Sequence, residues 1–354
     1  MVYFRDYIRE NLLKPTDRIL EFGPLNGPIA GKARFKNSSY ADIRTTDEIK
    51  KLYTTNDYLK STGIQINIDE IVDIDYVIKD SYKNTFKEVD KFDAIGLSHV
   101  IEHIPDIVNF FVDVSSILSP KGKLIIIYPD ARYCFDHFRN GTSFMDAYGV
   151  FTDSKNTGNR VLDFAYNVVH ENRPSFFWDG DKTASILPQN AFSDALKAHG
   201  ESKNGQLPDD MHFWPFADYQ FVKFLYDMDR AGLLAFDVDF FHPTQNSTQE
   251  FMIVLTPKSK KGISTNTYKK LLNDTHPVYK EARKQQKINR LKKDAEMFVA
   301  ERGRLLEKVS SLENDVARLD EELKAIYSSK RWVHASRIAS LKNRMVPTSR
   351  DENK

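Results

Sequence analysis

The sequence predicts an α/β protein whose core is a doubly wound, mostly parallel sheet. Five short apolar segments have the composition of buried strands and alternate with helical stretches. This alternation gives parallel strands with helices on both faces, a Rossmann-like arrangement. Ligands of such sheets bind beyond the carboxyl ends of the strands. The five segments are 18–23, 39–43, 74–78, 92–97 and 123–128.

Helices and two further strands complete the predicted domain. The segments 236–241 and 250–256 are expected to form an antiparallel terminal strand pair, so the domain spans residues 1–257. Apolar residues recur at helical spacing in three segments, 3–14, 106–118 and 217–231.

The alternation of strands and helices is lost after the fifth strand. Residues 130–210 are rich in aromatic residues, Asn, Asp and Gly, and they show no clear period. Long irregular segments in a compact domain are usually functional. We therefore expect a cap, or lid, inserted at this point.

The composition limits the class of protein. The 354 residues carry a net charge of +1, so no global field directs the chain to nucleic acid or to a membrane. The single cysteine, Cys134, makes neither an internal disulfide nor a structural zinc site. No signal peptide is recognisable, and the apolar run 124–127 is far too short to span a membrane. A cytoplasmic location is expected.

The C-terminal part follows a heptad pattern. After a linker at 258–285, apolar residues recur at alternating steps of three and four through 286–327. This pattern predicts a coiled coil that joins copies of the chain into a homo-oligomer. A single helix lying on its own domain is the alternative. The heptad positions are Ile288, Leu291, Ala295, Phe298, Arg302, Leu305, Val309, Leu312, Val316, Leu319, Leu323 and Ile326.

Residues 328–354 form a basic tail. The stretch 328–345 holds five Lys or Arg residues and no acid, together with apolar residues such as Trp332 and Ile338. Basic amphipathic segments bind anionic membranes or the grooves of partner proteins, and a solvated tail is the alternative. The tail is also similar to short endings of bacterial glycosyltransferases. We therefore expect contact with the inner face of a membrane or with a glycosyltransferase.

A glycine turn follows the first strand, with the sequence Glu-Phe-Gly-Pro-Leu-Asn-Gly-Pro at 21–28. Glycine tolerates positive φ and lets the backbone come close to a ligand. The spacing differs from the G-x-G-x-x-G dinucleotide pattern, and the Glu21 carboxylate would repel a phosphate. The loop therefore favours a cationic ligand, and a purely structural turn is the alternative.

Polar residues also follow the second and third strands. Asp42, about 20 residues past the loop, is placed to accept hydrogen bonds from both hydroxyls of a ribose. The alternative role of Asp42 is a helix N-cap. Asp80 and Ser81 are placed to bond an adenine amino group, or they form an ordinary turn.

The most specific segment is Phe-Asp-Ala-Ile-Gly-Leu-Ser-His-Val-Ile-Glu-His-Ile-Pro-Asp at 92–106. It resembles the class I S-adenosylmethionine (SAM)-dependent methyltransferases, in a bacterial branch associated with cell-surface polysaccharide gene clusters. The resemblance covers 15–257 and includes a Pro-Asp-x-Arg-Tyr-x-Phe-Asp run at 129–136 and an Asp-x-His-x-x-x-Phe element at 210–216. The family's usual E-x-G-x-G-x-G loop is altered at residues 24–28. The resemblance implies SAM as cofactor, with contacts at Glu21, Gly23, Pro24, Asn26, Asp42, Ile43, Asp80, Ser81, Ser98 and His99.

Transfer of a methyl group to a hydroxyl needs a base near the methyl group. His103, His212 and Asp210 are the candidates, because histidine titrates near neutral pH and a carboxylate accepts protons. Each histidine has a structural alternative: His103 as a cap of the following helix and His212 as a packed core residue.

The sequence also suggests roles for Glu102, for metal ligands and for residues that contact the substrate. Glu102 is expected to brace its loop. No tight cluster of metal ligands is visible in the sequence, so no metal site is predicted. The predicted substrate contacts are Asp130, Arg132 and Tyr133.

Together these features predict a SAM-dependent methyltransferase that O-methylates a glycan or lipid-linked sugar in surface polysaccharide biosynthesis. One alternative is a small-molecule methyltransferase whose coiled coil only dimerises it. Another is a non-catalytic SAM-fold scaffold that organises a biosynthetic complex. Nucleic acid is not expected as a substrate, because the core has no basic stripe and no Asn/Asp-Pro-Pro-Tyr/Phe signature follows the fourth strand.

Overall fold

The computed structural model divides into two compact units, Met1–Lys280 and Glu281–Lys354. Parts of the predicted linker (259–261 and 263) and of the predicted basic tail (345–354) lie outside the described residues. The structure describes residues 3–56, 66–208, 210–258, 262 and 264–344.

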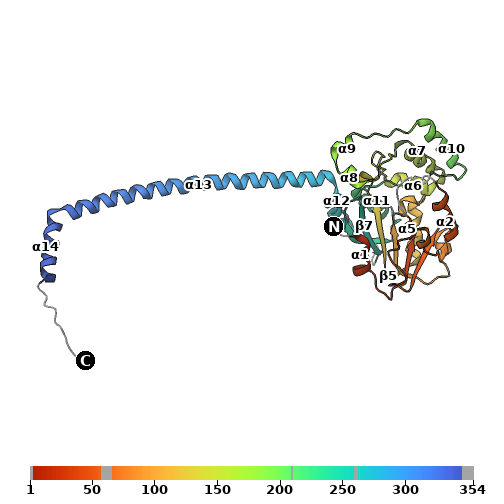
Figure 1. The fold of residues 1–354 in the computed structure, drawn as a ribbon, viewed down its shortest axis with the longest axis horizontal. Coiled ribbons are helices and arrows are strands. Elements are labelled where there is room, and N and C mark those ends of the chain that lie inside the picture. Colours follow the sequence, from red (N-terminus) through yellow and green to blue (C-terminus); the bar gives the residue numbers. More distant parts are fainter. Residues whose placement is uncertain (1–2, 57–65, 209, 259–261, 263, 345–354) are drawn as a thin grey trace, which may run out of the picture. The chain divides into compact units, whose positions relative to one another are not determined.

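One sheet runs through the first unit (Figure 1). Its seven strands, counted within the described residues, lie in the order β3-β2-β1-β4-β5-β7-β6. Strand β7 runs antiparallel to β5 and β6, and the other pairs are parallel. The predicted fold class is therefore confirmed. The strands are β1 (Ile19–Phe22), β2 (Ser38–Asp42), β3 (Tyr76–Val77), β4 (Phe92–Ser98), β5 (Leu118–Pro129), β6 (Phe236–His242) and β7 (Glu250–Pro257).

The strand order reverses at β1, which has β2 on one side and β4 on the other. The parallel register aligns the carboxyl ends of these three strands. Gly23, Asp42 and Ser98 therefore lie at the same edge of the sheet. Such a switch point is where doubly wound sheets bind their ligands.

Helices cover both faces of the sheet. Phe110 and Phe111 of α5 belong to the large core cluster on one face, and Phe4 and Ile8 pack with Ile125 on the other. The central strands are apolar on both sides, as a sheet covered by helices requires. The elements of these layers are α1 (Phe4–Tyr7), the π-helix η1 (Ile8–Leu12), α2 (Thr46–Thr55), η2 (Ile68–Glu70), α4 (Tyr82–Thr85), η3 (Ile101–His103), α5 (Ile107–Ile117) and α11 (Asp218–Arg230).

The cap is more regular than the sequence suggests. Residues 130–210 form a group of short helices, yellow-green to green in Figure 1, that gather at one end of the sheet. Several begin with a side-chain cap, as at Ser143, whose side chain and Asp146 make a reciprocal capping box. Two of them, α6 and α7, bury residues at a spacing of three, which the sequence analysis did not recognise. They are η4 (Ala131–Tyr133), α6 (Phe144–Thr152), η5 (Ser154–Asn156), α7 (Thr157–Asn167), α8 (Pro174–Phe177), α9 (Gly180–Ala184) and α10 (Phe192–Ser202).

The predicted linker contains a packed helix. Helix α12 (Thr265–Thr275) lies against α11, where the ring centroids of Tyr268 and Tyr226 are 5.3 Å apart. Tyr268 is buried, so α12 belongs to the first unit. The next helix, α13 (Pro277–Ser328), begins before the predicted coiled-coil start at residue 286. The sequence analysis placed α12 in the linker, although Tyr268 and Thr275 are buried and Leu271 and Leu272 pack against the core.

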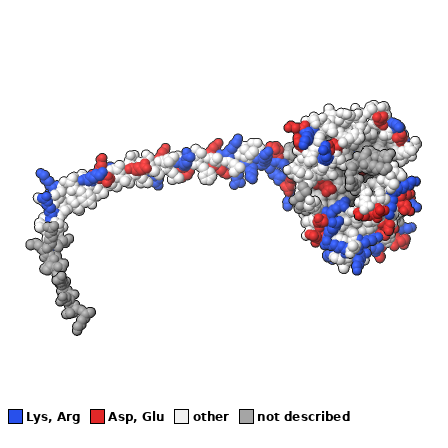
Figure 2. Space-filling model, viewed as in Figure 1, with Lys and Arg blue, Asp and Glu red and all other residues white. Residues whose placement is uncertain are grey.

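Within its described residues, the second unit contains most of one long helix and one shorter helix. Helix α13 buries none of its side chains, and heptad residues such as Leu305, Val309 and Leu312 are each about half exposed. Lys, Arg, Asp and Glu are interspersed along it (Figure 2). Helix α14 (Lys330–Arg344) follows. None of the described helices is long and apolar enough to cross a membrane.

Candidate active site

The glycine loop depends on Gly23. Its φ is +58°, and a Cβ added there would lie 2.7 Å from Cγ2 of Val100. A side chain at this position would therefore be strained and would clash with the segment that follows β4. The next residues form a tight turn, in which Gly27 N donates to the Pro24 carbonyl and Leu25 has a φ of +48°. Pro24 is buried, and Asn26 is partly exposed.

The side chain of Glu21 holds this loop through hydrogen bonds. Its side chain is buried, Oε1 accepts a hydrogen bond from Ile29 N at 2.7 Å, and Oε2 accepts one from Ala30 N at 3.0 Å. Burial raises the pKa of Glu21, and these two backbone hydrogen bonds oppose that rise. Both carboxylate oxygens therefore hold the returning end of the loop. The structure gives Glu21 this bracing role in place of the direct attraction of a cationic ligand inferred from the loop.

Two arginines of the N-terminal helix clamp the loop, which the sequence analysis missed. Arg5 Nη1 donates to the Gly27 carbonyl, and its Nη2 donates to Ser98 Oγ at 3.1 Å. Arg9 donates to the carbonyls of Ile29 and Pro28. Arg5 therefore joins the loop after β1 to the end of β4. The available signal was an arginine pair, four residues apart, on the helix that precedes β1.

The ends of β2 and β3 carry the other predicted cofactor contacts. Asp42 is partly exposed, its Oδ1 accepts from Arg44 N at 2.9 Å, and burial raises its pKa. The neighbouring Ile43 side chain is 62% exposed. It presents an apolar surface at the edge of the sheet where the glycine loop lies. Asp80 is exposed, whereas the hydroxyl of Ser81 caps α4 by accepting from Asn84 N. Asp42 and Ile43 thus remain placed for a ligand, and Ser81 has a structural use.

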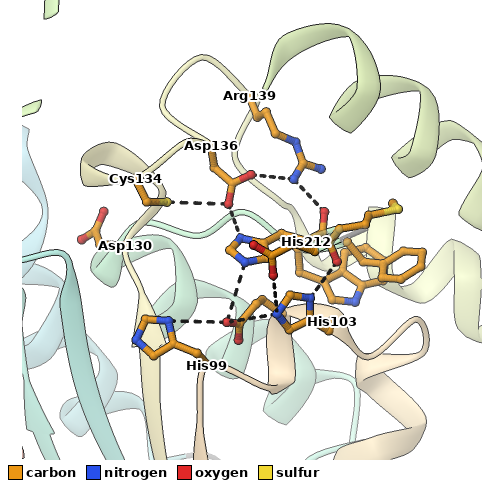
Figure 3. A network of polar contacts seen from close by, with 12 residues as sticks. His99, His103, Asp130, Cys134, Asp136, Arg139 and His212 are labelled. Atoms are coloured by element: carbon orange, nitrogen blue, oxygen red, sulfur yellow. Dashed lines mark hydrogen bonds and ion pairs between the residues drawn. The ribbon is translucent and has the colours of Figure 1, made fainter. Parts of the chain in front are cut away.

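A second polar group lies where β4 ends. Oε1 of Glu102 is 3.9 Å from His99 Nδ1, 3.8 Å from His103 Nε2 and 3.9 Å from His212 Nε2. We call these four residues the histidine–glutamate cluster. Figure 3 shows the three imidazoles converging on one carboxylate. The sequence had suggested no tight cluster, because His212 is distant in the chain.

The other nitrogen of each imidazole is fixed by an acceptor. His99 Nε2 lies 2.7 Å from Glu250 Oε1, and His103 Nδ1 lies 2.9 Å from the Met211 carbonyl. His212 Nδ1 lies 2.5 Å from Asp136 Oδ2. Carbonyls and carboxylates accept, so these ring nitrogens carry the proton. In the neutral rings, the nitrogens that face Glu102 therefore present lone pairs.

Burial and charge set the protonation of the cluster. Burial raises the pKa of Glu102, whose oxygens make no hydrogen bond. Burial, assisted by the neighbouring His212, lowers the pKa of His103 to about 3 and keeps that ring neutral. Burial alone would lower the pKa of His212, but the Asp136 carboxylate outweighs it and raises that pKa.

Asp136 and Arg139 support His212, and the sequence analysis named neither as a site residue. Arg139 Nη1 donates to Asp136 Oδ1 at 2.8 Å and to the His212 carbonyl at 2.6 Å. Burial alone would raise the pKa of Asp136, but the charges of His212 and Arg139 hold it well below its usual range. The signal was present, because Asp136 closes the Pro-Asp-x-Arg-Tyr-x-Phe-Asp run.

Backbone strain also concentrates at this site. His99 has a φ of +55° and Asp210 a φ of +53°, in the left-handed region that few non-glycine residues occupy. Oδ1 of Asp210 lies 3.8 Å from His103 Nε2. All three predicted bases, His103, His212 and Asp210, therefore lie together. Strain of this kind is typical of functional sites.

Two of the residues predicted to contact the substrate, Asp130 and Arg132, make hydrogen bonds and ion pairs within the protein. Asp130 is fully buried and accepts hydrogen bonds from Arg132, Asp218 N and Thr244 Oγ1. Arg132 also pairs with the carboxylate of Asp218 at 2.6 Å. Asp130 is thus an internal anchor of the cap, which the motif alone did not reveal.

Tyr133 is engaged as well. Its ring stacks on Trp178 with centroids 3.9 Å apart and an interplanar angle of 7°. Trp178 in turn donates to the Thr248 carbonyl at 2.7 Å. Tyr133 and Trp178 therefore pack two parts of the cap region together.

SAM fits the loop side of this site. The loop backbone at Gly23 forms a cradle without a side chain, Asp42 is partly exposed at the end of β2, Ser98 ends β4 and His99 follows it. The cradle lies at the switch point of the sheet, where a nucleoside ligand of this fold binds.

Residues 3–157 match a family model described as a methyltransferase domain. No curated protein matches the sequence. The solved mitomycin 7-O-methyltransferase MmcR is 10% identical, with 69% of this chain and 49% of that chain covered and a TM-score of 0.32. An S-adenosylmethionine-dependent methyltransferase from Clostridium acetobutylicum is 13% identical, with 73% and 93% covered and a TM-score of 0.34. A chain described as a zinc-dependent alcohol dehydrogenase from Rhodobacter sphaeroides is also 13% identical, with 72% and 88% covered and a TM-score of 0.38.

The residues that this family model matches include the N-terminal clamp, the glycine loop, strands β1 to β5 and three members of the histidine–glutamate cluster. Residues 3–157 therefore contain a methyltransferase domain, with SAM as its cofactor.

Proposed function

We propose that the protein O-methylates a sugar hydroxyl of a glycan or lipid-linked sugar. The observation that carries this proposal is the histidine–glutamate cluster beside the end of β4, with His212 held by Asp136. A hydroxyl of high pKa must lose its proton as it is methylated, whereas a thiolate or a neutral amine needs no such base. A buried group of histidines next to the cofactor loop meets that need.

The roles of the residues follow from their contacts. Bound SAM supplies a methyl group already activated on a sulfonium, so the protein orients the reactants and excludes water. The glycine loop, held at Gly27 by Arg5, admits the cofactor at the switch point beside Gly23, and Asp42 accepts hydrogen bonds from its ribose. The cluster removes the proton of the acceptor, and Asp136 stabilises positive charge on His212.

The cap favours a sugar acceptor. Several of its aromatic rings are partly exposed, among them Tyr148 (39%), Tyr166 (44%) and Phe192 (54%). The apolar faces of sugar rings stack on such side chains. Aromatic side chains present a large apolar body for such stacking.

The test is product identification. The purified full chain is incubated with methyl-labelled SAM and with lipid-linked sugars or polysaccharide from producing cells, and the labelled product is hydrolysed. We expect the label in a sugar methyl ether. His212→Ala is expected to retain SAM binding and to lose at least 10-fold in turnover. A label in an N-methyl, C-methyl or non-sugar product would overturn the proposal.

We also propose that α13 pairs with a second copy of the chain. Its heptad residues form an apolar stripe that no other described residue covers, and both signs of charge flank it. A narrow stripe of this kind is buried by a second helix with the same pattern. The basic helix α14 is proposed to lie on an anionic membrane surface, with Trp332 (44% exposed), Ile338 (60%) and Leu341 (59%) as apolar anchors.

A further inference from the structure

The Glu102 carboxylate presents an electrostatic problem. The residue has no exposed surface, and neither of its side-chain oxygens makes a hydrogen bond. A buried carboxylate without hydrogen bonds is strongly unfavourable unless a positive charge or a metal ion compensates it. Such a group therefore points to a ligand that belongs beside it.

The distances around Glu102 match a shared ion. The nitrogens of His103 and His212 lie 3.8 and 3.9 Å from Oε1, which is too long for hydrogen bonds and too short for an intervening water. Two ligands at about 2.1 Å from one tetrahedral ion lie about 3.4 Å apart. To reach that separation, the histidine–glutamate distances would shorten by about 0.4–0.5 Å, and the distance between the two histidine nitrogens, which lie within 4.8 Å, by up to about 1.4 Å.

We propose that Glu102, His103 and His212 bind one divalent transition-metal ion. Their ligand atoms all lie within 4.8 Å of one another. Two imidazoles and one carboxylate with an open fourth position form a donor set that suits zinc, and imidazole ligands disfavour magnesium and calcium. His99 Nδ1 lies 3.9 Å from the same oxygen and is not one of the three proposed ligands.

The surroundings prepare both histidines for a metal. His103 Nδ1 donates a hydrogen bond to the Met211 carbonyl, and His212 Nδ1 donates one to the Asp136 carboxylate. Each ring thus directs its Nε2 lone pair toward Glu102. Ligand histidines in metalloproteins are oriented by the same kind of carbonyl or carboxylate contact. Arg139 in turn holds Asp136 in place.

The open side of the site is accessible. The His103 side chain is 33% exposed and that of Asp210 is 29% exposed, whereas Glu102 and His212 lie beneath them. An acceptor hydroxyl would approach the ion from the side of His103 and Asp210. An ion there lowers the pKa of a hydroxyl it binds.

The role of the ion rests on the proposed O-methylation, whereas its binding does not. With His103 and His212 bound to the ion, Asp210 replaces the cluster as the base: the acceptor O–H bond breaks and its proton passes to Asp210 and then to solvent. The new O–CH₃ bond forms as the methyl–sulfur bond breaks, and sulfur keeps the electron pair as a thioether. No oxidant or reductant is needed.

Metal titration of the full chain tests the site. The protein is dialysed against a chelator and titrated with Zn²⁺ by calorimetry, and with Co²⁺ while visible absorption is recorded. We expect one ion per chain, with the intense visible bands of a tetrahedral cobalt site. Glu102→Gln keeps the side-chain shape, and His212→Asn removes the Nε2 ligand. Each substitution should weaken binding at least 10-fold. His170→Ala, which removes an exposed histidine of the cap, is the matched control and should bind normally.

The outcomes separate the site from the proposed function. Failure of the wild type to bind one Zn²⁺ or Co²⁺ per chain would overturn the site, as would unchanged binding by both cluster variants with native circular dichroism. Loss of binding in His170→Ala would show adventitious surface coordination. Stoichiometric binding without any methylated sugar would leave the site standing and remove the O-methylation proposal. Undiminished sugar methylation by metal-free protein would remove the catalytic role of the ion.

Discussion

His212 and Asp136 meet at 2.5 Å, Nδ1 to Oδ2, although the helices of the cap separate them in the sequence. The contact ties the two ends of the cap insertion together directly over the end of β4. The same bond orients the His212 ring toward Glu102. One buried pair therefore serves both the closure of the cap and the geometry of the site.

Removing the charge of Asp136 should destabilise the protein. Asp136→Asn leaves the buried guanidinium of Arg139 and the His212 ring without their carboxylate, and we expect a loss of about 3 kcal/mol in the free energy of unfolding. Urea denaturation measures it. The control is Lys197→Gln, which breaks an exposed pair with Glu201 and should change that free energy by less than about 0.5 kcal/mol. Equal, small effects of the two substitutions would contradict the structural role of Asp136.

Gly23 should not tolerate a side chain. Gly23→Ala places a Cβ 2.7 Å from Val100 Cγ2 at a φ of +58°, so we expect a destabilisation of about 1–3 kcal/mol and a marked loss of SAM affinity. Calorimetry with SAM and chemical denaturation measure the two effects. Gly31→Ala is the matched control, because a Cβ there meets nothing within 4 Å. If both variants bind SAM equally well, the cradle at Gly23 is not part of the cofactor site.

The clamp of Arg5 should support cofactor binding from outside the sheet. Arg5→Met removes its hydrogen bonds to the Gly27 carbonyl and to Ser98 Oγ, which allows the loop to move. A hydrogen bond from a charged group contributes about 1.5–3 kcal/mol, so SAM affinity is expected to fall about 10-fold or more. Lys36→Gln, at an exposed position, controls for the loss of charge. Unchanged affinity in Arg5→Met would show that the loop holds its shape without the clamp.

Self-association should depend on the heptad face of α13. The double variant Leu312→Asp and Leu319→Asp places carboxylates on the apolar stripe, where both residues are about half exposed in the single chain. We expect the oligomer to dissociate into monomers in light-scattering measurements coupled to gel filtration. Asn314→Asp adds a charge off the stripe and should leave the oligomer intact. A wild-type protein that is monomeric at micromolar concentration would contradict the pairing.

The basic helix should confer membrane binding. Deletion of residues 329–354 removes α14, and flotation with liposomes containing anionic lipid should then fall several-fold relative to the full chain. Neutral liposomes are the control, because the attraction is to negative surface charge. Equal flotation of the full and shortened chains would remove the membrane role. Binding to both liposome types would instead indicate an apolar contact.

Local patterns in the sequence determined much of the fold. The five buried strands, the terminal antiparallel pair and the loop with Gly23 are each encoded within a few consecutive residues. Apolar runs, helical periods and a glycine after a strand are signals of this range, and they predicted the order of the elements. They also placed Gly23, Asp42 and Ser98 at one edge, because parallel strands end together.

Only the tertiary structure decided how distant residues meet. Nothing near Glu102 in the sequence shows that His212 faces it, or that Asp136 holds His212. Likewise, no local pattern shows that Glu21 turns inward to bond the loop. Such contacts depend on the packing of several segments at once. The residues next to a side chain in the sequence do not show which distant residue it will contact. The sequence therefore predicted the elements and the cofactor edge, and the packing of the cap created the histidine–glutamate cluster.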